Sequence, residues 1–275
     1  MFAFNSFNER TLTLTDKEMF FLAGILGFDR ILGRDNPFPS QGTGTLTTSW
    51  KQVAVSLLQK GCLSAEQFES LVTRTSAGAH PFNGIYKRGC CLRYQYKTES
   101  GKQIYDSHTY FSSDGVIEIR QADDLPGHYI LRPMGALSEA CSLVMEQMNL
   151  NTYPANEMPA LTFSGQWFDD YIRNKQARRN RQLTNQLSEM TGDLEGSRLF
   201  AGVLSENRLY AEVQFSYWDE ENWQRKGAIL LADDDTNWIV RRSNLDQEDW
   251  MIAVPADKIH FRQMLLDWVQ QPESV

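Results

Sequence analysis

Apolar residues recur at helical spacing through the N-terminal part of the chain. Thr15 and Glu18 have the spacing of a capping box, and the apolar residues that follow predict a helix. Residues 33–46 are rich in glycine and proline and predict a loop. A second helix is predicted from Ser49 to Lys60, and a third begins at Ser64. The chain is therefore expected to open with a helical cluster.

From about Arg88 apolar and polar residues alternate with a period of two, which predicts strands. The strands after this first one are expected at Gln103–Phe111, Val116–Arg120 and Tyr129–Arg132, followed by a helix at Leu137–Met148. The Asp114-Gly115 pair between two of these strands is a strong hairpin signal. This part of the chain is expected to be a meander of strands that ends in a helix.

The remainder of the chain predicts the same plan again. Residues 161–190 have a helical pattern. Strands are expected at Leu199–Leu204, Leu209–Trp218, Gln224–Ala232, Trp238–Arg242 and Trp250–Val254. Pro255 and Asp257 open a last helix that carries Ile259, Phe261 and Trp268. The order is again helices, then strands, then one helix.

Residues of the two meanders also match when the sequence is shifted by about 121 positions. This shift places Asp114 on Asp235, Ile117 on Trp238 and Arg120 on Arg241, and one inserted residue then places Pro133 on Pro255. Chance similarity between two meanders is the alternative to a duplication. If the duplication is real, the two copies can pair edge to edge about a pseudo-two-fold axis.

The predicted fold class follows from this repetition. We expect an α+β protein with a central, mainly antiparallel β-sheet, two helical clusters and a pseudo-two-fold internal duplication. Residues 1–150 would hold the N-terminal helices with the first meander and helix, and residues 151–275 the second set. The two halves are expected to share one core.

Composition and charge exclude several classes of protein. The chain has 275 residues and a formal net charge of −8, which argues against general affinity for nucleic acid or anionic membranes. No apolar run is long enough for a membrane span, and the first residues do not predict a signal peptide. The four cysteines include an adjacent pair and no C-x-x-C motif, so we expect reduced thiols and a cytoplasmic protein without membrane insertion.

A catalytic site is the first chemical hypothesis. Asp106 and His108 would face the same side of a strand, and with Cys90 or Cys91 they could form the site of a Cys/His hydrolase. The competing interpretation is a polar strand face beside two small buried thiols, and the position matching His108 in the second copy is Ile229. We therefore expect no enzyme and no catalytic residues.

Metal and nucleic-acid binding have equally weak signals. The acidic clusters Asp233–Asp235 and Asp219–Glu221 lack the spacing of a calcium loop and favour solvated hairpin turns. The N-terminal helices also resemble a winged helix-turn-helix, but the candidate recognition helix Ser64–Ala77 carries Arg74 as its only basic residue. We expect no metal, cofactor or nucleic-acid partner, and a DNA-binding regulator remains an alternative.

Aromatic residues at a hairpin tip give the leading candidate for a binding surface. Trp218 and Trp223 flank a polar turn that contains Glu220 and Glu221, at the tip of the predicted hairpin. Such aromatics are common interface anchors, but they could equally pack against a neighbouring helix. We predict partner binding at these four residues, with the face of the C-terminal helix as a second candidate.

Short motifs near both ends of the chain resemble a known family. Four stretches are similar to segments of EspG-type proteins of type VII (ESX) secretion. Two of them are Leu14-Thr15-x-x-Glu18, which precedes an apolar helix, and Trp50–Leu58. The other two are Asp235-Thr236-x-Trp238-Ile239-Val240-Arg241-Arg242 and Trp250-Met251-x-x-Val254-Pro255-Ala256-Asp257. The family's Gly-Arg-Tyr triplet reads Asn237-Trp238-Ile239 here.

The resemblance implies a fold and a function. EspG-type proteins are cytosolic chaperones with a quasi-two-fold fold, and they have no catalytic residues. They bind helical-hairpin heterodimers near the hydrophobic tip of one partner. The expected function is therefore binding and release of helical secretion substrates of a type VII-like system, by a monomer or weak dimer.

Overall fold

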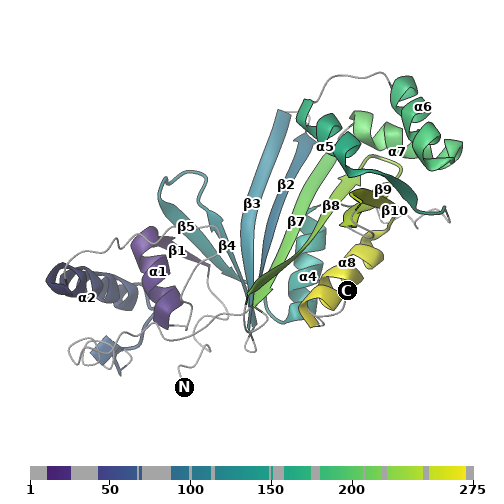
Figure 1. The fold of residues 1–275 in the computed structure, drawn as a ribbon. Coiled ribbons are helices and arrows are strands. Elements are labelled where there is room, and N and C mark those ends of the chain that lie inside the picture. Colours follow the sequence, from purple (N-terminus) through teal and green to yellow (C-terminus); the bar gives the residue numbers. More distant parts are fainter. Residues whose placement is uncertain are drawn as a thin grey trace. The chain divides into compact units, whose positions relative to one another are not determined.

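The computed structural model describes residues 11–25, 43–66, 68–69, 88–98, 101–112, 115–148, 150, 158–174, 180–206, 208–218, 222–243 and 248–270. The strands are β1 Leu12–Thr15, β2 Arg88–Thr98, β3 Gly101–Ser112, β4 Gly115–Gln121, β5 His128–Pro133, β6 Leu161–Ser164, β7 Leu209–Trp218, β8 Trp223–Ala232, β9 Asn237–Ser243 and β10 Trp250–Pro255. The helices are α1 Asp16–Ile25, α2 Thr43–Gln59, α4 Leu137–Gln147, α5 Gly165–Asn174, α6 Asn180–Thr191, α7 Leu194–Glu206 and α8 Lys258–Gln270 (Figure 1). In the described ranges, no helix is both long and apolar enough to cross a lipid bilayer.

The strands form a sheet in the order β1-β5-β4-β3-β2-β7-β8-β9-β10-β6. Antiparallel pairing joins β5 to β1 and β4, and β4 to β3. It also joins β9 to β8 and β10, and β10 to β6. Each half of this order contains a four-stranded meander whose last strand pairs with a short strand from earlier in the chain. The predicted α+β class with an antiparallel sheet is confirmed.

The two meanders repeat each other down to the register of their strands. Ile117 of β4 lies opposite Pro133 of β5, and Trp238 of β9 lies opposite Pro255 of β10. These are the pairs that the sequence shift superimposed. The register that the duplication requires is therefore present in both halves.

Backbone hydrogen bonds past the end of each hairpin repeat as well. The Met134 N–H donates to the Val116 carbonyl at 2.9 Å, and the Ala256 N–H donates to the Asn237 carbonyl at 2.9 Å. The same shift relates these two bonds. Chance similarity between two meanders does not require such agreement, so the structure favours a true internal duplication.

Each outer strand leads directly into a capped helix. Thr15 ends β1, and its Oγ1 accepts the Glu18 N–H at 3.3 Å; Ser164 ends β6, and its Oγ accepts the Trp167 N–H at 3.3 Å. The Thr15 N–H in turn donates to Glu18 Oε2 at 2.7 Å, which completes the predicted capping box. Both copies thus use a hydroxyl side chain to satisfy the first free N–H groups of a helix.

Contacts divide the chain into two compact units, and each has a hydrophobic core of its own. The first comprises residues 1–89, 107–136 and 217–224, and the second comprises residues 90–106, 137–216 and 225–275. In the first unit, Leu14 and Tyr129 from paired strands pack with Phe21 of α1 and Leu57 of α2. The predicted division at residue 150 and the shared core stay predictions.

The core of the second unit lies between its strands and the helices α5, α6 and α7. Phe163, Phe200 and Trp238 are fully buried there, with Leu183 and Leu187 of α6. The ring centroids of Phe163 and Phe200 are 5.4 Å apart, and those of Phe200 and Trp238 are 5.0 Å apart. Aromatic pairs at these distances add to the stabilisation from burial alone.

One predicted strand is a helix in the structure. Leu199–Leu204, expected to be a strand, lies inside α7. A short apolar run has the same appearance in either element. The residues before this run identify the element as a helix. Asp193 caps the helix by accepting the Gly196 N–H at 3.0 Å, and the buried residues of α7 recur at helical spacing.

Two other boundaries differ from the prediction. Residues 161–190 are not one helical segment, because Leu161–Ser164 forms β6 and pairs with β10 before α5 begins. The second helix begins at Thr43 rather than Ser49, so residues 43–46 of the predicted loop are helical; one glycine, Gly44, costs a helix only about 1 kcal/mol relative to alanine and does not prevent it. The partner of β6 is distant in sequence, so local periodicity could not reveal that strand.

Candidate partner-binding surfaces

The predicted hairpin is present in the structure. β7 ends at Trp218, β8 begins at Trp223, and the two strands are neighbours in the sheet. Glu220 and Glu221 lie outside the described residues, and so do the side chains of both tryptophans. The binding role of these four residues therefore stays a prediction.

Strand β7 is anchored by its buried face. Ala211, Val213 and Phe215 are buried and alternate with the exposed residues Glu212 and Gln214. The Phe215 ring lies 6.4 Å from the ring of Trp268 in α8. Packing on one face of the strand thus fixes the part of the hairpin that precedes its tip.

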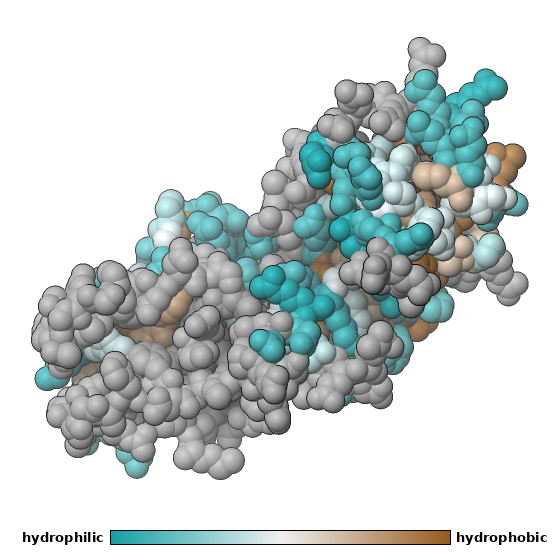
Figure 2. All heavy atoms as spheres, viewed as in Figure 1, coloured by the Kyte–Doolittle hydropathy of each residue, from teal (hydrophilic) through white to brown (hydrophobic). Residues whose placement is uncertain are grey.

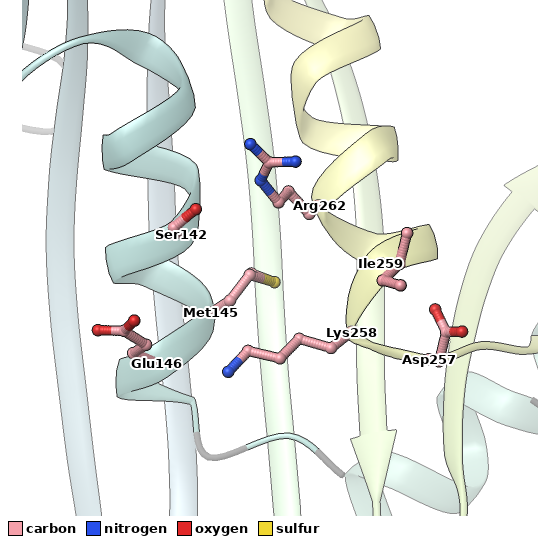
Figure 3. A pocket seen from close by; sticks show the side chains of 7 residues that line it. All are labelled: Ser142, Met145, Glu146, Asp257, Lys258, Ile259 and Arg262. Carbon is pink, nitrogen blue, oxygen red and sulfur yellow. The ribbon is translucent and has the colours of Figure 1, made fainter. Parts of the chain in front are cut away.

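The second predicted surface, the face of the C-terminal helix, adjoins a groove between α4 and α8. The groove has a volume of about 310 Å³. Its lining residues are Ser142, Met145 and Glu146 of α4, together with Asp257, Lys258, Ile259 and Arg262 at the start of α8 (Figure 3). Met145 is buried, whereas Ile259 is 73% exposed.

Asp257 fixes the first turn of α8. Its Oδ1 accepts the His260 N–H at 2.8 Å and lies 2.8 Å from His260 Nδ1. Burial would raise the pKa of Asp257, but the hydrogen bonds from the His260 backbone and ring together outweigh it, so the pKa is lowered. Asp257 is therefore an ionised N-cap, which stabilises the helix N-terminus.

The prediction that Ile259 belongs with Phe261 and Trp268 on the apolar face of the last helix was wrong. Phe261 and Trp268 are buried, whereas Ile259 is exposed. At 100° per residue, Ile259 lies about 200° from Phe261 and on the opposite side from Trp268. A helical wheel that begins at Asp257 would have found this exposed apolar position.

Arg262 joins the two helices that form the groove. Its Nη2 donates to Ser138 Oγ at 2.9 Å. Cys141 of α4 is buried, and burial raises its pKa to about 11 although the Arg262 charge lowers it. The Cys141 thiol is therefore protonated at neutral pH, the form in which a cysteine is a weak nucleophile.

The alternatives of catalysis and metal binding gain little from the described residues. Asp106 is exposed and His108 half-buried on β3, while the side chains of Cys90 and Cys91 are outside the description, so the hydrolase hypothesis remains untested. Asp233 Oδ1 accepts the Asp235 N–H at 2.9 Å and the Thr236 N–H at 2.7 Å. This confirms the predicted hairpin turn.

The winged-helix alternative has no support among the described residues. Arg74 and most of the segment Ser64–Ala77 lie outside them.

On the face of the molecule in Figure 2, the described residues show hydrophobic surface in patches among hydrophilic residues.

Comparison with known proteins places the fold. No family model matches this chain, and no curated protein matches its sequence. Among solved structures it is similar to the Mycobacterium tuberculosis type VII secretion system chaperone EspG5, solved in complex with the PE25–PPE41 dimer. The identity is 10% and the TM-score 0.54, and the match covers 94% of this chain and 96% of that chain.

The chain therefore has an EspG-like fold. The likeness extends over nearly the full length of both chains, so it includes both copies of the duplicated unit. The fold class expected from the sequence motifs is confirmed.

Proposed function

We propose that this protein is a cytoplasmic chaperone that binds helical substrate proteins of a type VII-like secretion system. The observation that carries the proposal is the similarity to a chaperone of such a system along 94% of this chain. The motifs that resemble EspG-type proteins support it independently. The mechanism is stoichiometric binding and release, which requires complementary surfaces and no chemical step.

We assign client binding to the tip of the β7–β8 hairpin, at Trp218, Glu220, Glu221 and Trp223. Tryptophan is enriched at the energetic centres of interfaces because it buries a large apolar area at small entropic cost. The two glutamates would form a polar rim beside these anchors. A client with an exposed apolar helical tip would thereby be kept from aggregation.

Replacing both Trp218 and Trp223 by Ala is expected to abolish client capture. Loss of one tryptophan anchor typically costs about 2 kcal/mol or more, which is about thirtyfold in Kd. The test is co-purification with a co-expressed helical-hairpin substrate of a type VII system, quantified by mass spectrometry. Trp250→Ala is the matched control, because Trp250 is a partly exposed tryptophan at the start of another strand.

The control should retain the client, and both variants should melt near the parent temperature. Undiminished capture by the double variant would overturn the assignment of the hairpin tip. Recovery of nucleic acid alone, or of no protein client by the parent chain, would overturn the chaperone function itself.

A further inference from the structure

The two outermost strands of the sheet, β1 and β6, differ at their free edges. In β1 the Thr13 carbonyl accepts a hydrogen bond from Lys60 Nζ at 3.0 Å. The Thr15 N–H donates to Glu18 Oε2 at 2.7 Å. An edge strand with unpaired backbone groups is a template for another strand. The ion pair of Glu18 and Lys60 therefore closes the edge of β1.

The corresponding edge of β6 is open. The Gly165 N–H donates to the Asp249 carbonyl at 2.9 Å, on the side of β10. Backbone groups of successive residues alternate between the two edges of a strand, so those of Thr162 and the N–H of Ser164 point away from β10. Within the part of the chain that the structure describes, these outward groups have no hydrogen-bond partner. The position that holds the capping carboxylate in the first copy is Trp167 here.

Exposed apolar side chains lie beside this open edge. The turn between α6 and α7 lies over the start of β6, because a methyl group added at Gly196 would come within 3.0 Å of Leu161 Cδ2. On either side of this turn, Met190 is 37% exposed and Leu194 is 63% exposed. Thr162 is exposed on the opposite face of the strand. A strand added here would therefore place alternate apolar side chains next to the turn and polar ones in solvent.

The charge beside the edge is negative. Glu189 and Glu195 flank the same turn and are exposed, and in the described ranges neither has an ion-pair partner. They favour a basic residue in an incoming strand. In an antiparallel pair, the end of the partner strand that lies beside Leu161 is its C-terminal end.

Two observations argue against a second copy of this chain as the occupant. α6 packs on β6, since Leu183 and Leu187 share a core with Leu161 and Phe163. Two copies paired through β6 about a two-fold axis would hold both α6 helices on one side of the sheet, over strands about 4.8 Å apart, whereas packed helices need about 8–10 Å. The pairing would also bring the exposed glutamates of both copies together.

We propose that the open edge of β6 binds an extended segment of another protein by β-augmentation. The segment pairs antiparallel to β6, alternates apolar and polar residues, and has a basic residue at its C-terminal end. Main-chain hydrogen bonds to Thr162 and Ser164 provide affinity, and the apolar side chains beside the α6–α7 turn provide specificity. This surface is separate from the hairpin tip assigned to the client, so its test needs no client.

The probe is a fluorescent peptide with blocked ends and the sequence Thr-Leu-Thr-Leu-Thr-Leu-Thr-Lys. Fluorescence anisotropy with the full chain should give a Kd of about 0.1–1 mM, because a strand of four residues offers few hydrogen bonds. Exchanging the last residue of the peptide for glutamate should weaken binding about threefold or more.

Backbone methylation of the probe tests the pairing without altering the protein. Residues directly opposite one another share a face, so the threonines of the peptide direct their N–H groups toward β6 and the leucines direct theirs away. Peptide with N-methylated threonines should not bind. Peptide with N-methylated leucines should bind within about threefold of the unmethylated probe.

Proline substitution tests the same pairing from the side of the protein. Thr162→Pro removes one outward N–H and keeps the ladder with β10, since an edge strand accepts proline where its N–H faces solvent. It should weaken peptide binding about fivefold or more. Thr13→Pro is the matched control, because Thr13 has the same place in β1, whose edge is closed. It should bind the peptide like the parent chain, and both variants should melt near the parent temperature.

Three outcomes would overturn the proposal. The first is absence of binding at about 2 mM peptide, and the second is equal binding of the two methylated peptides. The third is dimerisation of the parent chain that Thr162→Pro abolishes, because a second copy would then occupy the edge. The chain with both Trp218 and Trp223 replaced by Ala should bind the peptide like the parent, which separates this edge from the client surface.

Discussion

Trp238→Ala is expected to lower the free energy of unfolding by about 4 kcal/mol, the range for truncation of a large buried aromatic residue. The Trp238 side chain is fully buried, and its ring lies 5.0 Å from that of Phe200. Its Nε1 donates to Thr236 Oγ1 at 3.2 Å. Alanine would leave a cavity between β9 and α7 that a well-packed core cannot close.

Chemical denaturation followed by circular dichroism measures this loss, and thermal melting should shift by about 8–16 °C. Trp238→Phe keeps an aromatic ring next to Phe200 and should cost less than half as much. Trp250→Ala removes a tryptophan that is 37% exposed and should cost less than about 1 kcal/mol. Equal losses for the buried and the exposed tryptophan would contradict the core described for the second unit.

Lys60→Met is expected to destabilise the first unit by about 2 kcal/mol at neutral pH. Lys60 Nζ lies 2.7 Å from Glu18 Oε2, and the Glu18 side chain is 6% exposed while that of Lys60 is 35% exposed. Removing one partner of a buried ion pair costs about 3–5 kcal/mol, and the solvent access of Lys60 reduces this figure. The substituted chain would retain a buried carboxylate without its cation.

The pH dependence of this variant separates charge from packing. Burial alone would raise the pKa of Glu18, but hydrogen bonds from Lys60, Ser56 and Thr15 outweigh burial and lower it. In the parent chain this contribution is complete above the unfolded pKa near 4.5 and is lost as the pH falls through the lower folded value. In Lys60→Met burial dominates, so Glu18 becomes protonated more easily and the deficit should narrow between about pH 7 and pH 4.

Urea denaturation at both pH values provides the measurement, and Glu18→Gln/Lys60→Met is the control. The double variant has no buried charge, so its deficit relative to the parent should narrow on acidification only because the parent loses the contribution of Glu18. A deficit of Lys60→Met that stays constant from about pH 7 to pH 4 would show that Lys60 acts through packing of its aliphatic chain alone.

Features encoded within a few neighbouring residues were predicted well. The capping box of Thr15 and Glu18 and the antiparallel pairing of β3 with β4 appear where the sequence placed them, while Asp114 itself lies outside the described residues. Caps and tight turns depend on side chains within three or four positions of one another. The structure adds that the strand register repeats in the two copies that the sequence shift superimposed, because a duplicated sequence carries the same alternation twice.

Features that depend on partners distant in the sequence were not predicted. β6 is a strand because it pairs with β10, and Leu199–Leu204 is helical because α7 buries its apolar face against α6 and the sheet. The side chains at the hairpin tip that we assign to client binding have a compositional signal in Trp218 and Trp223, but neither periodicity nor a motif marks their role. The groove beside Ile259 had no signal, since it needs two helices from different parts of the chain.

The sequence by itself determined the α+β class, the duplicated order of helices and strands, the turns and caps, and the acidic charge of this protein. Those properties follow from local hydrogen bonding and from the periods of about 3.6 and 2 at which helices and strands bury apolar residues. Only the tertiary structure decided that Glu18 meets Lys60, that β6 joins β10 and that Ile259 stands exposed beside a groove. Each of these depends on which segments pack together, and side-chain burial is a property of the assembled fold rather than of any one segment.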